Sequence, residues 1–231
     1  MTIPTDLEIK LFRNADAFER WLSANNAKAP GVWMRFAKKG RGLTSITYAE
    51  AVDVALCWGW IDGQARSYDD ESWLQRFTPR RSRSPWSKIN TRKAEALIAS
   101  GRMQPPGLAA IEAAKADGRW AAAYDPASTA ALPPELQAAL DANPKAKAFF
   151  ETLRGMNRYS IIYRVNDAKK PETRAARIAD LVASLTRHET VRDRLVKKQA
   201  AAKKSTPAAK KKPSTSRVEK RPAKGPARKR R

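Results

Sequence analysis

The 231-residue sequence has little of the chemistry on which most metal proteins and hydrolases depend, because it contains one cysteine, Cys57, and one histidine, His188. A single cysteine excludes an intramolecular disulfide, and the two side chains together cannot form a structural zinc site. The phosphate-binding patterns GxGxxG and GxxxxGK[ST] do not occur. The sequence therefore predicts no metal site, no cofactor and no catalytic residue set.

Long apolar runs are also absent, and none approaches the roughly 18 residues of a membrane-spanning helix. The first ten residues lack the charged and then apolar segments of a secretion signal. We therefore expect neither membrane insertion nor secretion. A single cysteine fits a reducing compartment, and we expect a cytoplasmic protein that associates with the nucleoid if its charged tail binds DNA.

Aromatic residues are missing after Tyr163, and all seven tryptophans lie between Trp21 and Trp120. We therefore expect the hydrophobic core to be centred in the first 165 residues. The predicted organisation is a globular module over residues 1–195, made of an α+β part over 1–100 and a helical part over 101–195, followed by a tail over 196–231.

The tail is rich in Lys, Arg, Ala, Pro, Ser and Thr, a composition that buries too little apolar surface to offset chain entropy. We predict that it is disordered. It carries most of the net charge of +23, since residues 197–231 hold 15 basic side chains and one acid and so contribute +14, which leaves +9 for the rest.

A tail of this charge is expected to bind nucleic acid or another polyanion by counterion release. Acidic proteins and anionic lipid surfaces are alternative partners. The candidate nucleic-acid-binding residues are Lys197, Lys198, Lys203, Lys204, Lys210, Lys211, Lys212, Arg228, Lys229, Arg230 and Arg231.

Hydrophobic periodicity and capping residues predict the regular elements of the module. In the first hundred residues we expect strands at 7–12 and 32–37 and a hairpin over 60–78 that turns at 69–71. We also expect three helices. The first is at 15–25 and is capped by Asn14, the second begins with the capping box Thr47–Glu50 and ends at Gly59, and the third begins at Ser84–Pro85 and ends at Gly101.

Helices are expected to dominate the rest of the module, at about 106–117, 134–142, 145–154 and 172–187, while 159–165 is ambiguous between strand and helix. Because the strands come first and the helices later, the predicted class is α+β. The expected architecture is a small N-terminal mixed sheet with helices, followed by a helical C-terminal half and the disordered basic tail.

The first candidate site is the segment that follows the second predicted helix and contains Trp58, Trp60 and Asp62. Two indole rings and a nearby carboxylate would form an apolar pocket with one polar anchor. Alternatively both tryptophans belong to the core and Asp62 belongs to a turn. Asp62 is also the acid or base that an unrecognised enzymatic activity would use.

The second candidate site is residues 76–93, which contain seven Lys or Arg and no acid and precede a predicted helix. Helix N-termini favour anions, and aromatic rings stack on bases and other aromatic ligands. The candidate ligand-binding residues here are Arg76, Arg80, Arg81, Trp86, Ser87, Lys88 and Asn90. The alternative is a solvated basic loop that covers core aromatics. A third basic segment, residues 169–177, is interpreted as a solvated helix face.

Five sequence blocks occur in an order that resembles the bacterial YdeI/OmpD-associated proteins, the bacteriocin-protection family: KKG, ALCWGWIDG, RFTPRRSRSPWSKIN, GRMQPPGLAAIEAAKADGRW and KKPETRAARI. The resemblance extends over about residues 5–190. It implies an α+β N-terminal part, a helical C-terminal part and a link to tolerance of bacteriocins, antimicrobial peptides or envelope stress, and it implies no catalytic residues. The tail departs from this pattern and resembles the Lys/Ala/Pro-rich extensions of histone H1-like bacterial proteins.

These observations favour a non-enzymatic stress or bacteriocin-protection protein, with a Trp/Arg-lined surface for an anionic or aromatic ligand and a polyanion-binding tail. The alternative hypothesis is a nucleic-acid-associated protein, which either belongs to the nucleoid or binds RNA. The second alternative is an unrecognised enzyme that uses Asp62.

Overall fold

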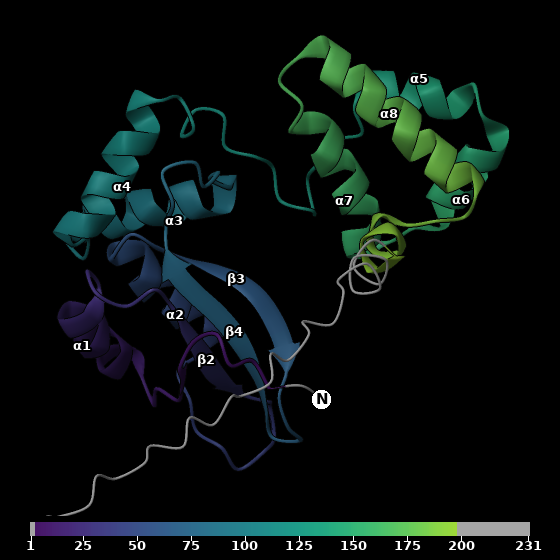
Figure 1. Ribbon diagram of the computed structural model, residues 1–231. Helices are drawn as coiled ribbons and strands as arrows, with labels where there is room; N and C mark the ends of the chain where they lie inside the picture. Colours follow the sequence, from purple (N-terminus) through teal and green to yellow (C-terminus); the bar gives the residue numbers. More distant parts are fainter. Residues whose placement is uncertain (1–2, 198–231) are drawn as a thin grey trace, which may run out of the picture.

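A computed structural model describes residues 3–197 and divides them into two parts, a mixed sheet with helices and a bundle of helices, joined by a connecting segment (Figure 1). The predicted α+β class is confirmed. The tail, predicted to be disordered, lies outside the described residues apart from Val196 and Lys197. Residues 191–197 are helical, and Lys197, which the sequence assigned to the tail, pairs with Glu189 at 2.5 Å.

The sheet has the order β1–β2–β4–β3, with β1 (Ile9–Lys10), β2 (Val32–Ala37), β3 (Trp60–Ser67) and β4 (Ser72–Pro79). β1 runs parallel to β2, and β4 pairs antiparallel with both β2 and β3. The predicted hairpin is therefore confirmed. β1 is shorter than predicted because only Ile9 and Lys10 pair with β2.

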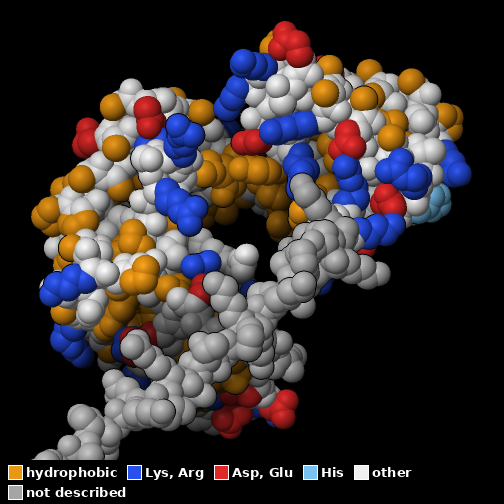
Figure 2. Space-filling view, in the orientation of Figure 1, with side chains coloured by type: hydrophobic (Ala, Val, Ile, Leu, Met, Phe, Trp, Pro, Cys, Tyr) orange, Lys and Arg blue, Asp and Glu red, His pale blue; other side chains and the backbone are white. Residues whose placement is uncertain are grey.

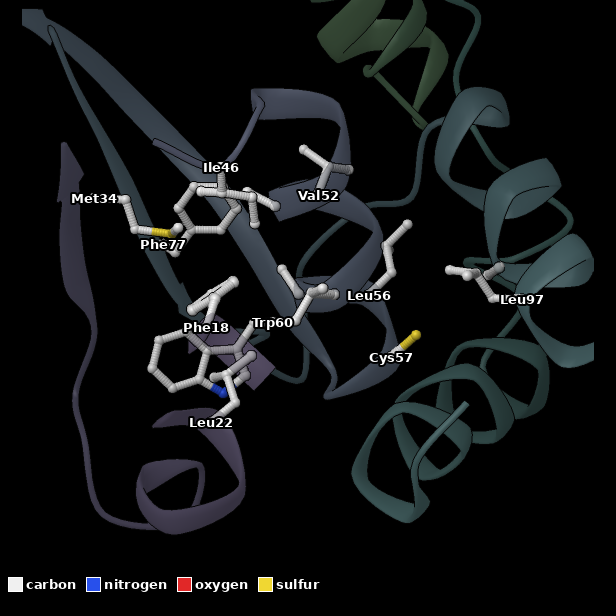
Figure 3. Packing of buried hydrophobic residues seen from close by; sticks show 14 of the residues in the cluster. Phe18, Leu22, Met34, Ile46, Val52, Leu56, Cys57, Trp60, Phe77 and Leu97 are labelled. Atoms are coloured by element: carbon white, nitrogen blue, oxygen red, sulfur yellow. The ribbon is translucent and has the colours of Figure 1, made fainter. Parts of the chain in front are cut away.

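Helices α1 (Ala15–Asn25) and α2 (Tyr48–Cys57) cover one face of this sheet (Figure 1). The predicted caps are confirmed, since Asn14 accepts a hydrogen bond from the Ala17 amide and Thr47 and Glu50 form a reciprocal capping box. Figure 3 shows how the core side chains of these helices and of the sheet meet, with Phe18, Met34, Trp60 and Phe77 among them.

Helices α3 (Lys88–Ala99) and α4 (Pro105–Ala116) pack against α2. The predicted start of α3 at Ser84–Pro85 is wrong, because Ser87 is the N-cap and accepts a hydrogen bond from the Asn90 amide at 3.1 Å. The Ser84 hydroxyl instead accepts from the Arg81 amide, closing a turn before the helix. Ser87 is buried and its backbone pairs with Tyr124, whereas Ser84 lies in the preceding turn.

The second part consists of α5 (Pro134–Asp141), α6 (Pro144–Thr152), α7 (Gly155–Asn166) and α8 (Pro171–Thr186). The ambiguous segment 159–165 is helical, because Ile161 and Val165, four residues apart, are buried against neighbouring helices. These helices enclose a hydrophobic cluster of their own that extends to Val191 and shares no residue with the first. The expectation of a core centred in the first 165 residues thus accounts for the first cluster and misses the α8 side of the second.

Candidate ligand-binding cleft

The connecting segment of residues 117–133, which contains turns at 117–122 and 127–129, joins α4 to α5 and positions the candidate site by pairing with the start of α3. The Tyr124 amide donates to the Trp86 carbonyl at 3.0 Å, and the Lys88 amide donates to the Tyr124 carbonyl at 2.9 Å. On its other side the segment meets α7, where the Tyr159 hydroxyl donates to the Asp125 carbonyl at 2.7 Å. The Tyr124 backbone is therefore fixed between the two parts.

A cavity of about 520 Å³ opens at this junction, within the range of small-molecule sites. Figure 2 shows apolar side chains gathered along the upper edge of the opening between the two parts. The rings of Tyr124 and Tyr163 meet edge to face with their centroids 5.2 Å apart, and Tyr159 lies 6.0 Å from Tyr163. We call this site, lined by Tyr124, Tyr159 and Tyr163, the tyrosine cleft.

The polar side chains of this cavity leave an excess of positive charge. Both of its acids are paired with basic residues, Asp125 with Lys88 at 2.7 Å and Asp167 with Arg177 at 3.0 Å, and Arg119 is paired with Asp117. Two other lining cations, Arg83 and Lys169, form no ion pair within residues 3–197. We call this side of the tyrosine cleft the polar compartment.

A second hollow of about 520 Å³ adjoins the first and shares the three tyrosines and Asp167 with it. Its remaining lining includes Met156 of α7 and Val191 and Leu195 of the last helical segment. Met156 is 68% exposed and Leu195 is 47% exposed, so apolar surface faces solvent here. We call this side the apolar compartment.

Burial sets the protonation state of the tyrosines in the cleft. It raises the pKa of Tyr159 to about 12, and it is also the main reason that the pKa values of Tyr124 and Tyr163 lie above the ordinary value. All three rings are therefore neutral phenols at neutral pH, which can stack with a ligand and donate hydrogen bonds to it.

Arg80 supports the wall of the cleft from behind. Its guanidinium lies 3.7 Å from the centre of the Trp86 ring and donates to the Pro85 carbonyl at 3.2 Å. Its Nε and Nη2 atoms are buried and have no hydrogen-bond partner among the described residues. Burial lowers the pKa of Arg80 to about 10. This pKa is still well above 7, and the side chain is therefore a cation at neutral pH.

The structure brings together some of the residues that the sequence singled out. Arg80, Trp86, Ser87 and Lys88 gather around Tyr124, through the contacts given above and through the Ser87–Tyr124 backbone bridge. Asn90 contributes its amide to the cap of α3. Arg81 is exposed and does not line the cavity.

The other predicted residues lie elsewhere. Trp60 is fully buried, and its indole N–H donates to the Asn26 side chain at 2.6 Å, while Trp58 is half-buried at the end of α2. Asp62 accepts a hydrogen bond from the Tyr48 hydroxyl at 2.6 Å. Arg76 lies on the opposite face of the sheet and pairs with Asp6 at 3.1 Å.

Sequence reasoning missed most of the residues that line the cleft, namely Arg83, Arg119, Tyr124, Tyr159, Tyr163 and Lys169. One signal was available, since Tyr159 and Tyr163 are four residues apart and so share a face once their segment is helical. In the segment interpreted as a solvated face, Arg174 pairs with Glu135, and Arg177 with Asp167.

The remaining reactive side chains lie away from the cleft. His188 stacks on Phe149 with the ring centroids 4.8 Å apart, and burial raises the pKa of the Cys57 thiol to about 11. Among residues 3–197 no group of three or more His, Cys, Asp or Glu side chains could hold a metal ion. Within the same residues, none of the helices has the length and apolar character to span a bilayer.

The fold and the cleft define an α+β unit linked to a helical bundle, with an aromatic site at their junction. Residues 129–188, which make up most of the bundle, match the family model described as "Bacteriocin-protection, YdeI or OmpD-Associated". This match supports the family resemblance for the helical part. Residues 10–110 match a different model, described as a domain of unknown function (DUF8412). No curated protein and no solved structure matches the chain.

Proposed function

We propose that the chain is a non-enzymatic protein of the bacteriocin-protection type that acts by binding a small anionic or aromatic ligand in the tyrosine cleft. The match of residues 129–188 to the bacteriocin-protection family supports the class. The position of Asp62 supports a binding role over an enzymatic one, because this acid does not line the cavity and its carboxylate is hydrogen-bonded to Tyr48.

The observation that carries the proposal is that one cavity is lined both by three clustered phenol rings and by cations that form no ion pair among the described residues. Neutral aromatic walls favour a flat ligand, and Arg83 and Lys169 favour a negative group attached to it. The acids of the cavity do not oppose this preference, because Lys88 and Arg177 already neutralise them.

Calorimetric titration of the full chain with benzoate, and with benzamide as its uncharged counterpart, tests the site. Benzoate is expected to bind more tightly than benzamide. The double variant Arg83→Ala/Lys169→Ala is expected to lose about tenfold in benzoate affinity, as for charged hydrogen bonds, and to bind benzamide unchanged.

The matched control is Arg81→Ala/Lys170→Ala, which removes the same charge from neighbouring residues that do not line the cavity. Equal loss of affinity in both double variants would show that the overall charge, and not the cleft, attracts the anion. In cells, full-length protein is expected to raise tolerance to a bacteriocin, and the Arg83→Ala/Lys169→Ala variant is expected to raise it less.

Nucleic-acid association is the second candidate function, and the charge of +14 in residues 197–231 favours it. Apart from Lys197 these residues lie outside the described part of the chain. DNA affinity of the full chain is expected to fall ~10³-fold or more between 50 and 200 mM salt. A chain ending at Lys197, which keeps the Glu189 pair, should lose this binding, and if it binds as well as the full chain the tail is not the site.

A further inference from the structure

The two compartments of the tyrosine cleft differ in chemistry although they share their aromatic wall. The polar compartment holds Arg83, Arg119 and Lys169. The apolar compartment is lined on its far side by Met156, Val191 and Leu195. A ligand held against the tyrosines therefore meets cations at one end, and at the other end it meets these apolar side chains with Arg164 beside them.

Two of the three apolar residues that line the apolar compartment, Met156 and Leu195, are not part of either hydrophobic core. Met156 and Leu195 are absent from both clusters and expose 68% and 47% of their surface, whereas Val191, at 8%, belongs to the second cluster. Met156 stands at the second position of α7, and an unbranched thioether side chain adapts to ligands of different shape. An apolar group that lies against these side chains would remove both from water.

Charge and composition argue against the basic tail as the natural occupant. The tail is positively charged and contains only two large aliphatic residues, Val196 and Val218, whereas the polar compartment is itself positive. Arg164, which lines the apolar compartment, adds a further cation that forms no ion pair among the described residues. The cleft complements an anion.

We propose that the ligand is an amphipathic anion, with a carboxylate or similar head in the polar compartment, a flat middle against the tyrosines and an alkyl or aryl end in the apolar compartment. This inference rests on the proposed function and names the class of ligand for the same site. The charge of the ligand's head is what the cations recognise. The apolar end of the ligand contributes affinity in proportion to the apolar surface that it buries.

The test is calorimetric titration of the full chain with benzoate, 4-ethylbenzoate and 4-butylbenzoate, each below its aggregation concentration. Affinity is expected to rise about fourfold for each methylene that becomes buried, so that 4-butylbenzoate binds at least about 50-fold more tightly than benzoate. The variant Met156→Gln/Leu195→Gln is expected to lose most of this gain, measured as the ratio of 4-butylbenzoate affinity to benzoate affinity within the same protein.

The matched control is Leu108→Gln/Ile98→Gln, which replaces two apolar residues that are each 40% exposed and lie outside the cleft. This control is expected to keep the full gain. If benzoate binds but 4-butylbenzoate binds no more tightly, or if the control loses the gain as well, the amphipathic ligand is excluded and the proposed function stands. If neither ligand binds, both proposals fail.

The same chemistry occurs in free amphipathic acids and in anionic lipids of a bilayer, and a vesicle experiment separates these sources. Binding to phosphatidylglycerol vesicles is expected to be purely electrostatic, so that salt weakens it and Met156→Gln/Leu195→Gln leaves it unchanged. If vesicle binding instead depends on Met156 and Leu195 while dispersed 4-butylbenzoate does not bind, the free acid is the wrong ligand.

Discussion

At the scale of single residues, Tyr159 links the stability of the molecule to its cleft. Its hydroxyl donates to the Asp125 carbonyl of the connecting segment, and burial raises its pKa to about 12, from an ordinary value of about 10. The unfolded chain therefore loses this proton at lower pH than the folded chain does. The stabilisation from Tyr159 is complete below pH 10 and is lost as the pH rises toward 12.

Replacement of Tyr159 by Phe tests this relation. The variant is expected to be less stable at pH 7 by ~1 kcal/mol, because the Asp125 carbonyl loses its donor. The difference in the free energy of unfolding between the wild type and the variant, measured by urea titration, should shrink between pH 10 and 12. A difference that stays constant over this range would contradict the assignment.

At the scale of elements, the junction of α2 and α4 depends on a glycine. The Gln104 amide, which precedes α4, donates to the Cys57 carbonyl at the end of α2, so the positive end of one helix meets the negative end of the other. Gly107 permits this approach, since a Cβ atom at that position would lie 2.2 Å from the Cys57 oxygen.

The substitution Gly107→Ala is therefore expected to destabilise the protein by ~1–3 kcal/mol, because the two helices must separate. Replacement of glycine by alanine inside a helix usually stabilises a protein, so this result would be opposite in sign to the usual effect. Gly42→Ala is the control, because a Cβ there meets nothing within 4 Å, and it should change the melting temperature little. Equal melting temperatures for the two variants would refute the close contact.

The same elements show which features can be predicted from sequence. The caps Asn14 and Thr47 were predictable because capping depends on residues three positions apart. The start of α3 was not, because Ser84 and Ser87 both offer a capping hydroxyl, and the pairing of Tyr124 with the chain around Ser87 depends on the folded structure. Burial of Ile161 and Val165 likewise overrides the strand propensity of their segment.

The cleft was less predictable than the fold for the same reason. Tyr159 and Asp125, which join its two sides, are 34 residues apart, and nothing local indicates that they meet. Basic residues of 76–93 were recognised as candidates, but only the folded structure separates Arg83, which lines the cavity, from Arg81, which does not.

At the scale of the whole molecule, two hydrophobic clusters share no residue and are bridged by the connecting segment. All seven tryptophans precede residue 121 and so belong to the side of the first cluster, whereas the second part is helical. Tryptophan fluorescence therefore reports on one part, and far-ultraviolet circular dichroism reports on both.

Truncation of Leu181, buried in α8, is expected to destabilise the bundle by ~2–5 kcal/mol. In Leu181→Ala, part of the circular dichroism signal should be lost at lower denaturant concentration, while the tryptophan fluorescence transition stays in place. Leu56→Ala, in the first cluster, should shift the fluorescence transition instead. If both probes move together in both variants, the parts unfold as one cooperative unit.

The connecting segment also limits how the two parts can be exchanged between related genes. The first family match ends at residue 110 and the second begins at residue 129, so residues 111–128, which include most of the connecting segment, belong to neither match. Yet Tyr124 is paired with the chain around α3 and Asp125 accepts from Tyr159 of α7. A recombination event between the parts would therefore lose the cleft unless the incoming segment brought a tyrosine at position 124 and held the next carbonyl within reach of Tyr159.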